Sequence, residues 1–201
     1  MSENDNTVNM SSEKNRYHHG DLRAALIEEG LKLIDAGPAE ALSLREIARN
    51  AGVSATAVYR HFPDKAALLG ALCQEGHIKI AKSFQAAMAS ARPGIEAFNA
   101  MGRAYVHFAL DHPSLFRLMM AEPGRAPVPV PPPSTGAGAD GMQMLVNAID
   151  SVFGADMPKP VREARRLKAW SLVHGLAMLM LDGQVPADRA LIDAVVDARS
   201  L

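Results

Sequence analysis

The amino-acid sequence predicts an all-α protein. Apolar residues recur three and four positions apart in one segment after another, which is the spacing of an amphipathic helix. Breaks such as Gly37-Pro38 and Pro93-Gly94 separate these segments, and no segment shows the alternation of a half-buried strand. We therefore expect about nine helices, in a three-helix N-terminal domain and a larger helical C-terminal domain.

The first helix is predicted to begin at Gly20-Asp21, with Asp21 as its N-cap, and to end at Gly37-Pro38. Residues 1–16 before it are rich in Ser, Asn and Glu and carry little to bury, so we expect a disordered tail. The apolar residues of the helix cover one broad arc: Leu22, Leu26, Ile27, Leu31, Leu33 and Ile34.

Two short helices joined by a tight turn follow the first helix. Ser43 to Glu46 has the capping-box spacing, in which the serine hydroxyl accepts from the third helical amide and Glu46 reaches back. Gly52 suits the left-handed conformation of a sharp turn, Ser54 is placed to cap the next helix, and Pro63 ends it. This arrangement is a helix-turn-helix, the motif that places its second helix in the major groove of DNA.

The rest of the chain predicts a helical body. The expected helices run from Asp64, its N-cap, through Phe84, then over 95–110, 114–120, 142–153, 160–181 and 186–201. Pro- and Gly-rich residues 123–141 predict a loop of extended or disordered character. We divide the chain into a tail (1–16), a helix-turn-helix domain (17–65) and a helical ligand-binding and dimerisation domain (66–201).

Composition limits the classes of function. The formal net charge is −1, which argues against an architectural DNA binder and restricts any DNA contact to a local patch. The single cysteine, Cys73, falls in an apolar helical pattern, is expected to be buried, and fits a reducing compartment. The N-terminus lacks the basic and apolar regions of a signal peptide, and the longest apolar run, Leu176–Leu181, is far shorter than the ~20 residues of a membrane span. We expect a cytoplasmic protein with no membrane partner.

The helix after Ser54 has one face suited to DNA. Steps of about 100° per residue place Val58 and Phe62 on one side and Thr56, Ala57 and Arg60 on the other. Arginine hydrogen-bonds guanine, and the methyl groups of Thr and Ala contact thymine, so these three outward residues are predicted to contact bases. The predicted phosphate contacts are Ser43, Arg45, Ser54, Tyr59, His61 and Lys65, assisted by the helix amino-termini at the two serines. On spacing alone, an ordinary helical hairpin with a solvated polar face is the alternative.

The same stretch resembles a known family. Ile47-Ala48, Ala51-Gly52-Val53-Ser54, Tyr59, His61-Phe62, Lys65 and Leu68-Leu69 together resemble the N-terminal domain of TetR-family transcriptional regulators, over Asp21 to Leu72. The resemblance implies that the third helix enters the major groove, with the base and phosphate contacts named above. The chain departs from the family at Thr56, where many members carry Gly, so the base contact there is in question. Tyr17, His18 and His19 resemble a short arm that touches DNA in some members; a solvated tail is the alternative.

The helix that opens at Pro160 predicts a dimer. From Ala169 to Leu181 it is apolar on every side except at Ser171 and His174, and a helix that is apolar all round must be covered all round. Together with the last helix, this predicts a two-fold homodimer through a four-helix bundle, as the resemblance also implies. The predicted interface residues are Leu172, Gly175, Leu176, Leu179, Leu191 and Val195. Trp170 to Gly175 also resembles the stretch that marks a subgroup with a Trp-His-Gly C-terminal domain.

The abundant methionine and aromatic residues of the body predict an adaptable apolar cavity. Its predicted lining is Met101, Tyr105, Phe108, Met119, Met120, Met144, Trp170 and His174. Tyr105, His107 and His174 are the polar groups expected to orient a ligand. For each residue taken singly, plain core packing is the alternative.

No cofactor, metal site or catalytic site is predicted. His107 and His112 stand five positions apart, off the one-turn spacing of helix-borne ligands, and no nucleophile–base motif or phosphate-binding loop is present. The predicted function is a homodimeric DNA-binding transcriptional regulator, a repressor released from a palindromic operator by a small apolar or amphipathic ligand. The alternative is a small-molecule-binding protein, a carrier or an enzyme, that keeps a vestigial helix-turn-helix.

Overall fold

The computed structural model describes residues 22–121 and 137–200. Within these residues every regular element is a helix, which confirms the predicted all-α class. The α-helices are α1 (Leu22–Ala36), α2 (Leu44–Asn50), α3 (Ala55–His61), α4 (Lys65–Ala89), α5 (Ile95–Asp111), α6 (Pro113–Met120), α7 (Ala137–Phe153), α8 (Lys159–Leu181) and α9 (Arg189–Val195), with short 3-10 turns η1 (Ala39–Ala41) and η2 (Ala198–Ser200). The predictions for the 1–16 tail, the Tyr17–His19 arm and the Asp21 cap lie outside the described residues.

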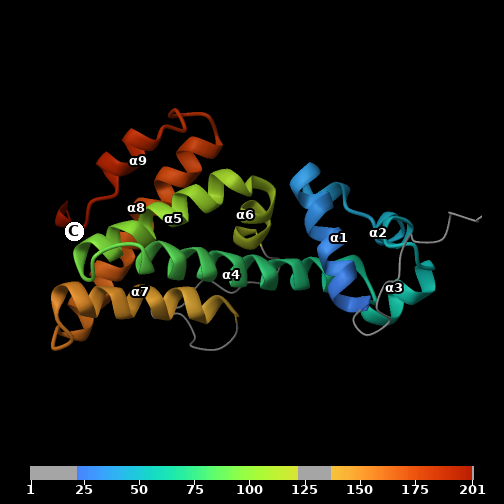
Figure 1. The fold of residues 1–201 in the computed structure, drawn as a ribbon, viewed down its shortest axis with the longest axis horizontal. Helices are drawn as coiled ribbons and strands as arrows, with labels where there is room; N and C mark the ends of the chain where they lie inside the picture. Colours follow the sequence, from blue (N-terminus) through green and yellow to red (C-terminus); the bar gives the residue numbers. More distant parts are fainter. Residues whose placement is uncertain (1–21, 122–136, 201) are drawn as a thin grey trace, which may run out of the picture.

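Helix α4 connects the two ends of an elongated molecule (Figure 1). The first three helices gather around the start of α4, and α5 to α9 gather around the rest of it. Helices α5 and α7 lie along opposite sides of α4, and α8 packs mainly on α5. The N-terminal helices therefore join the body through α4 and through the contacts that α1 makes with α6.

The core of the N-terminal helices comes from the residues with helical spacing. Leu26, Ile34, Ile47, Val58 and Phe62 are all buried, and they close the space between α1, α2 and α3. Further along, Cys73 of α4 is buried as predicted, and its thiol donates to the carbonyl oxygen of Leu118, 3.6 Å away. No helix of the described ranges is both long and apolar enough to cross a membrane.

Three predicted turn and cap residues are confirmed. Gly52 has a φ of 68°, the left-handed conformation that a residue with a Cβ rarely adopts. The Ser54 hydroxyl accepts from the amide of Ala57 at 3.2 Å, and the Asp64 carboxylate accepts from the amide of Ala67 at 2.8 Å. These caps satisfy amides that the first turns of α3 and α4 leave without a helical partner.

The capping box at the start of α2 is wrong. Ser43 holds the N-cap position, but its side chain makes no cap hydrogen bond. Glu46 turns instead to Arg49, one helical turn ahead on the exposed face, with its Oε1 3.2 Å from Nη2. A cation at this spacing competes for the carboxylate that the reciprocal cap requires.

Two predicted boundaries are also wrong. Residues 137–141, predicted as the end of a loop, form the start of α7 despite the low helix propensity of glycine, and Gly141 lies beside α4, where a Cβ on it would stand 3.6 Å from the ring of Phe84. The helix predicted over 186–201 is limited to Arg189–Val195 and is capped by Asp188, whose carboxylate accepts from the amide of Leu191 at 2.9 Å. It ends early because the backbone beyond Val196 hydrogen-bonds a side chain of α5.

Candidate nucleic-acid interface and cavity

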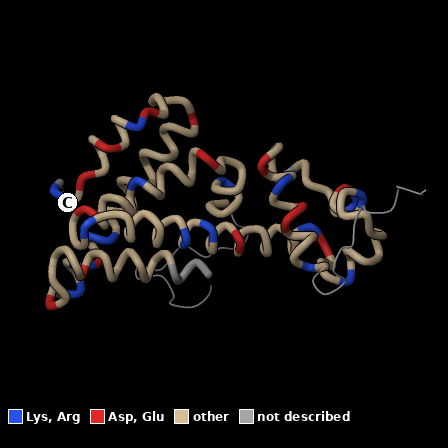
Figure 2. Tube along the Cα trace, in the orientation of Figure 1, with Lys and Arg blue, Asp and Glu red and all other residues tan. Residues whose placement is uncertain are grey.

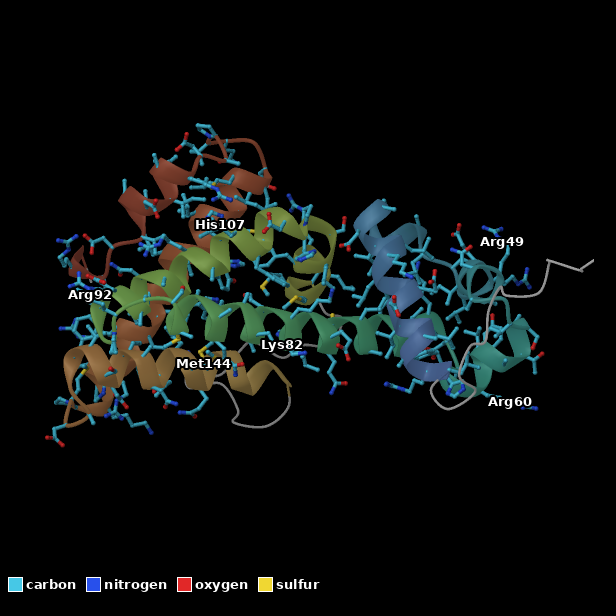
Figure 3. The ribbon with its side chains drawn as sticks, viewed as in Figure 1. Arg49, Arg60, Lys82, Arg92, His107 and Met144 are labelled. Atoms are coloured by element: carbon cyan, nitrogen blue, oxygen red, sulfur yellow. The ribbon has the colours of Figure 1, made fainter. Side chains whose placement is uncertain are left out.

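Helix α3 presents one face to the core and one to solvent. Val58 and Phe62 are buried, whereas Thr56 and Arg60 are exposed and Ala57 is half-buried. Figure 3 shows Arg60 and Arg49 at the end of the molecule that α2 and α3 form, away from the body. The three residues predicted to contact bases therefore lie on the surface of a short, well-packed helix.

A contact that the sequence did not predict holds the end of α3. The guanidinium of Arg23 on α1 lies 5.4 Å from the centroid of the Phe62 ring, within cation–π range. Helical spacing places Arg23 within the apolar arc of the first helix, but spacing does not show which residue of another helix lies opposite, so the sequence did not pair Arg23 with Phe62. The contact ties the C-terminal end of α3 to α1.

The residues predicted to contact phosphate surround this face. Arg45, Ser54, Tyr59 and His61 are exposed, and Tyr59 is 47% exposed although it is a large apolar ring. Ser43 and Lys65 are half-buried at the starts of α2 and α4. Between Leu44 and Lys65 the chain carries four basic and two acidic residues, so the segment from α2 to the start of α4 has a local charge of +2 in a chain of net charge −1 (Figure 2).

The body contains a mostly apolar cavity of about 120 Å³, lined by residues of α4, α5, α6, α7, α8 and the C-terminal segment. Five of the residues predicted to line it do so: Met101, Tyr105, Met119, Met120 and Trp170. Phe98 and Met142, which belong to the abundant aromatic and methionine residues on which the prediction rests, line it as well. The wall also includes the following residues that were not predicted: His77, Ile80, Phe84, Asn99, Gly102, Gly141, Leu145, Ala169, Val173, Val196, Asp197 and Ala198. Sulfur atoms gather beside α4 in this part of the molecule (Figure 3).

Three residues predicted for the cavity lie elsewhere. Phe108 lines a second, open hollow on the outer side of α4 and α5, together with His107. Met144 is partly buried against the core, and Figure 3 places it on α7 beside α4. His174 is not part of the lining; its Nδ1 shares a hydrogen bond of 3.0 Å with the hydroxyl of Tyr105, so two of the three polar groups predicted to orient a ligand are paired with each other.

The C-terminal segment after α9 forms one wall of the cavity. Oδ1 of Asn99 on α5 accepts from the amide of Ala198 at 2.7 Å, and Nδ2 lies 3.4 Å from Oδ1 of Asp197. Gly102 leaves room for Val196, because a Cβ there would stand 2.7 Å from its Cγ1. The guanidinium of Arg199, then its backbone amide and the side-chain amide of Asn99, hold the pKa of Asp197 below its ordinary value. Asn99 carried no signal in the sequence, since a lone Asn inside a helix usually faces solvent.

The residues predicted for a dimer interface divide into two groups. Leu176 is only 7% exposed within the single chain, so the body itself covers it, whereas Leu172 is half-buried and lines the cavity. Leu179 is 41% exposed, and no atom lies within 4 Å of where a Cβ of Gly175 would stand. Leu191 and Val195 are half-buried. The start of α8, which is polar in sequence, exposes two further apolar residues, Val161 and Leu167.

Comparisons with known proteins cover both ends of the chain. Residues 26–72 match the family "Bacterial regulatory proteins, tetR family", and residues 98–199 match "Tetracyclin repressor-like, C-terminal domain". A solved protein of unknown function from Rhodococcus sp. RHA1 is 33% identical, with a TM-score of 0.74, over 93% of this chain and 95% of its own.

Two more distant structures share the fold. A TetR family transcription regulator from Marinobacter aquaeolei VT8 is 19% identical, with a TM-score of 0.59, over 87% of this chain and 91% of its own. A TetR-family transcriptional regulator from Streptomyces coelicolor is 22% identical, with a TM-score of 0.61, over 87% and 76%. TetR-family regulators bind DNA and act as dimers; the Trp-His-Gly subgroup stays a prediction. From the two matched regions and the shared fold, the chain belongs to the TetR family and is a DNA-binding transcriptional regulator.

Proposed function

We propose that this regulator is a repressor, which binds a palindromic operator as a homodimer and leaves it when a small ligand fills the cavity. The observation that carries the proposal is the exposed face of α3, with Thr56 and Arg60 outward and Val58 and Phe62 buried behind them. A helix packed in this way can enter a groove without losing its own support.

The base contacts are assigned to Thr56, Ala57 and Arg60. Arg60 has the fork of donors that matches guanine, and the methyl groups of the other two match thymine. The phosphate contacts are assigned to Ser43, Arg45, Ser54, Tyr59, His61 and Lys65, which surround the face. The local charge of +2 supports these roles, because phosphate contacts supply much of the affinity of a DNA-binding protein.

The second subunit is assigned to the outer side of α8 and to α9, where a partner can contact the half-buried or exposed residues Gly175, Leu179, Leu191 and Val195. A two-fold dimer must hold its two α3 helices about 34–36 Å apart to reach successive major grooves. We place the end of the DNA-binding domain at residue 65, so that α4 belongs to the body.

The route from cavity to DNA is assigned to α4 and α1. Ile80 and Phe84 of α4 line the cavity, while the start of the same helix packs on the DNA-binding end. At the junction, Nδ1 of His112 lies 3.5 Å from Oδ1 of Asp35 on α1. A ligand that changes the tilt of α4 would change the spacing of the two α3 helices. To move the ratio of released to DNA-binding conformation from 1:99 to 99:1, the ligand must favour the released conformation by about 5.5 kcal/mol.

Replacement of Arg60 by Ala tests the proposal. Once an operator has been selected from random duplex DNA, Arg60→Ala is expected to weaken operator binding by about 5- to 150-fold, the loss of one bidentate base contact. Binding to random duplex is expected to change much less at the same salt concentration. The matched control is Arg92→Ala, an exposed arginine paired with Glu96 at the far end of the molecule. Unchanged discrimination between operator and random DNA in Arg60→Ala would contradict the assignment.

A further inference from the structure

Arg166 of α8 is a charged side chain in an apolar place. It is 1% exposed, and among the residues described here it is the one charged or polar side chain that is buried. Burial of a guanidinium is unfavourable unless acceptors satisfy its donors, so such a residue calls for an explanation from its surroundings.

The acceptors around Arg166 fall short of what its guanidinium offers. Nε donates to Oε2 of Glu163 at 3.0 Å; Nη2 lies 3.0 Å from the same oxygen but makes no hydrogen bond. Nη1 donates to the sulfur of Met142 at 3.3 Å, and a thioether is a weak acceptor. A guanidinium carries five N–H donors, so this group has capacity for a further acceptor.

The charges beside Arg166 leave a local excess of positive charge. Arg162 is paired with Asp150, with Nε and Oδ1 2.8 Å apart. Arg165 stacks on an aromatic ring, with its guanidinium carbon 4.1 Å from the centroid of Phe153. This corner of α7 and α8 thus holds three arginines and two carboxylates, a balance that favours an anion.

Met142 separates the guanidinium from the cavity. Its side chain lines the cavity wall and also receives the Nη1 donor. Ala169 and Trp170, one turn after Arg166 on α8, line the same wall, so Arg166 lies next to the cavity, behind Met142, without lining it itself. Methionine is unbranched and changes rotamer readily, so it can yield this position to a better acceptor.

We propose that the cavity binds a small amphipathic carboxylate, whose acid group displaces the Met142 thioether and pairs with Arg166. A carboxylate matches the fork of a guanidinium with two parallel hydrogen bonds, and these charge-assisted bonds are stronger than a contact with sulfur. The apolar body of the ligand occupies the cavity of about 120 Å³, close in size to a cavity of about 150 Å³ that binds benzene. The assignment of this ligand as the signal, though not the anion site itself, rests on the proposed function.

The test uses matched acids and amides as probes, benzoate against benzamide and hexanoate against hexanamide. Trp170 is the single tryptophan of the chain and lines the cavity, so its fluorescence reports occupancy directly. For the full-length protein we expect each acid to bind at least about tenfold more tightly than its amide. A tenfold ratio corresponds to about 1.4 kcal/mol of difference in binding free energy. Equal affinity for acid and amide, or no binding of either acid up to its solubility limit, would overturn the proposal.

Three variants locate the preference at one side chain. Arg166→Met removes the charge at similar length and is expected to bring the acid-to-amide ratio to about one, while Arg166→Lys keeps the charge and is expected to keep part of the ratio. Lys168→Met, which removes an exposed charge from the same helix, is the control and is expected to keep the full ratio. If circular dichroism shows that Arg166→Met does not fold, the acid-to-amide ratios of wild type and of Arg166→Lys decide whether the site exists. An unchanged acid-to-amide ratio in a folded Arg166→Met refutes the site.

Release of operator DNA is measured separately with the same probes. Acids that show the expected ratio at Trp170 but leave DNA bound would contradict ligand release and would support the anion site. A wild-type ratio of one, with release of DNA by the amides, would contradict the anion site and would support ligand release. The two failures are therefore distinguishable.

Discussion

Asn99→Ala is expected to loosen the C-terminal wall of the cavity. Oδ1 of Asn99 accepts from the amide of Ala198 at 2.7 Å, and Ala198 is 4% exposed, so the variant leaves a buried N–H without its acceptor. An unsatisfied buried donor costs about 1–3 kcal/mol. The second contact, from Nδ2 to Asp197 at 3.4 Å, is long and adds little.

The control for this variant is Asn147→Ala on α7. Asn147 is exposed, and its Oδ1 accepts from Nε2 of Gln143 at 2.9 Å, one turn earlier on the same helix. Both substitutions gain the same helix propensity, so the difference between the two variants isolates the contact with the C-terminal segment. An exposed pair of this kind contributes only about 0.2–0.5 kcal/mol.

Thermal unfolding and amide exchange measure the difference. The melting temperature of Asn99→Ala is expected to fall below that of Asn147→Ala by about 2–4 °C for each kcal/mol. The amide of Ala198 is expected to exchange about 5- to 150-fold faster in Asn99→Ala, the ratio that 1–3 kcal/mol gives. Equal melting temperatures, with unchanged exchange at Ala198, would refute the assignment of Asn99 as the anchor of this wall.

Two further predictions follow from caps and charges. Ser54→Ala removes a cap hydrogen bond of 3.2 Å and is expected to lower the free energy of unfolding, measured in urea, by about 0.5–2 kcal/mol. The hydroxyl of Ser43 makes no cap hydrogen bond, so Ser43→Ala is expected to leave the free energy of unfolding unchanged. Equal losses in the two variants would contradict these cap assignments. Because the folded-state pKa of Asp197 is lowered, its contribution to stability is present above the ordinary carboxyl pKa of about 3.9 and is lost as pH falls through the lowered value. Wild type and Asp197→Asn are therefore expected to differ in melting temperature at pH 6 and to converge in strong acid, and a constant difference across this range would rule out the carboxylate as the cause.

Sequence patterns predicted the helix-turn-helix well because its signals are local. Gly52, Ser54 and Asp64 act on backbone groups within four residues of themselves, and the structure confirms all three. The capping box at Ser43 was wrong for a reason that is also local, since Glu46 had a second partner, Arg49, at helical spacing. Two local rules competed there, and spacing alone did not rank them.

The body was predicted less completely because its limits depend on contacts between distant segments. The early end of α9 depends on Asn99, which stands 99 positions before Ala198 in the chain. Helix α7 packs against α4, and at Gly141, predicted as loop, a Cβ would stand 3.6 Å from the ring of Phe84 on α4. Leu176, predicted for the dimer interface, is covered by the chain itself, because helical spacing shows that a face is apolar and does not show what covers it.

The sequence by itself determined the helical class, the helix-turn-helix with its outward residues, and the membership of a regulator family, because each depends on periodicity or on a short motif. Only the tertiary structure decided which apolar residues line the cavity, how the C-terminal segment forms one wall of it, and that Arg166 is buried next to it, behind Met142. In the sequence Arg166 is one of several charges that make the start of its helix polar. Its burial depends on α7 packing against α8, so it could be known only once the helices were assembled.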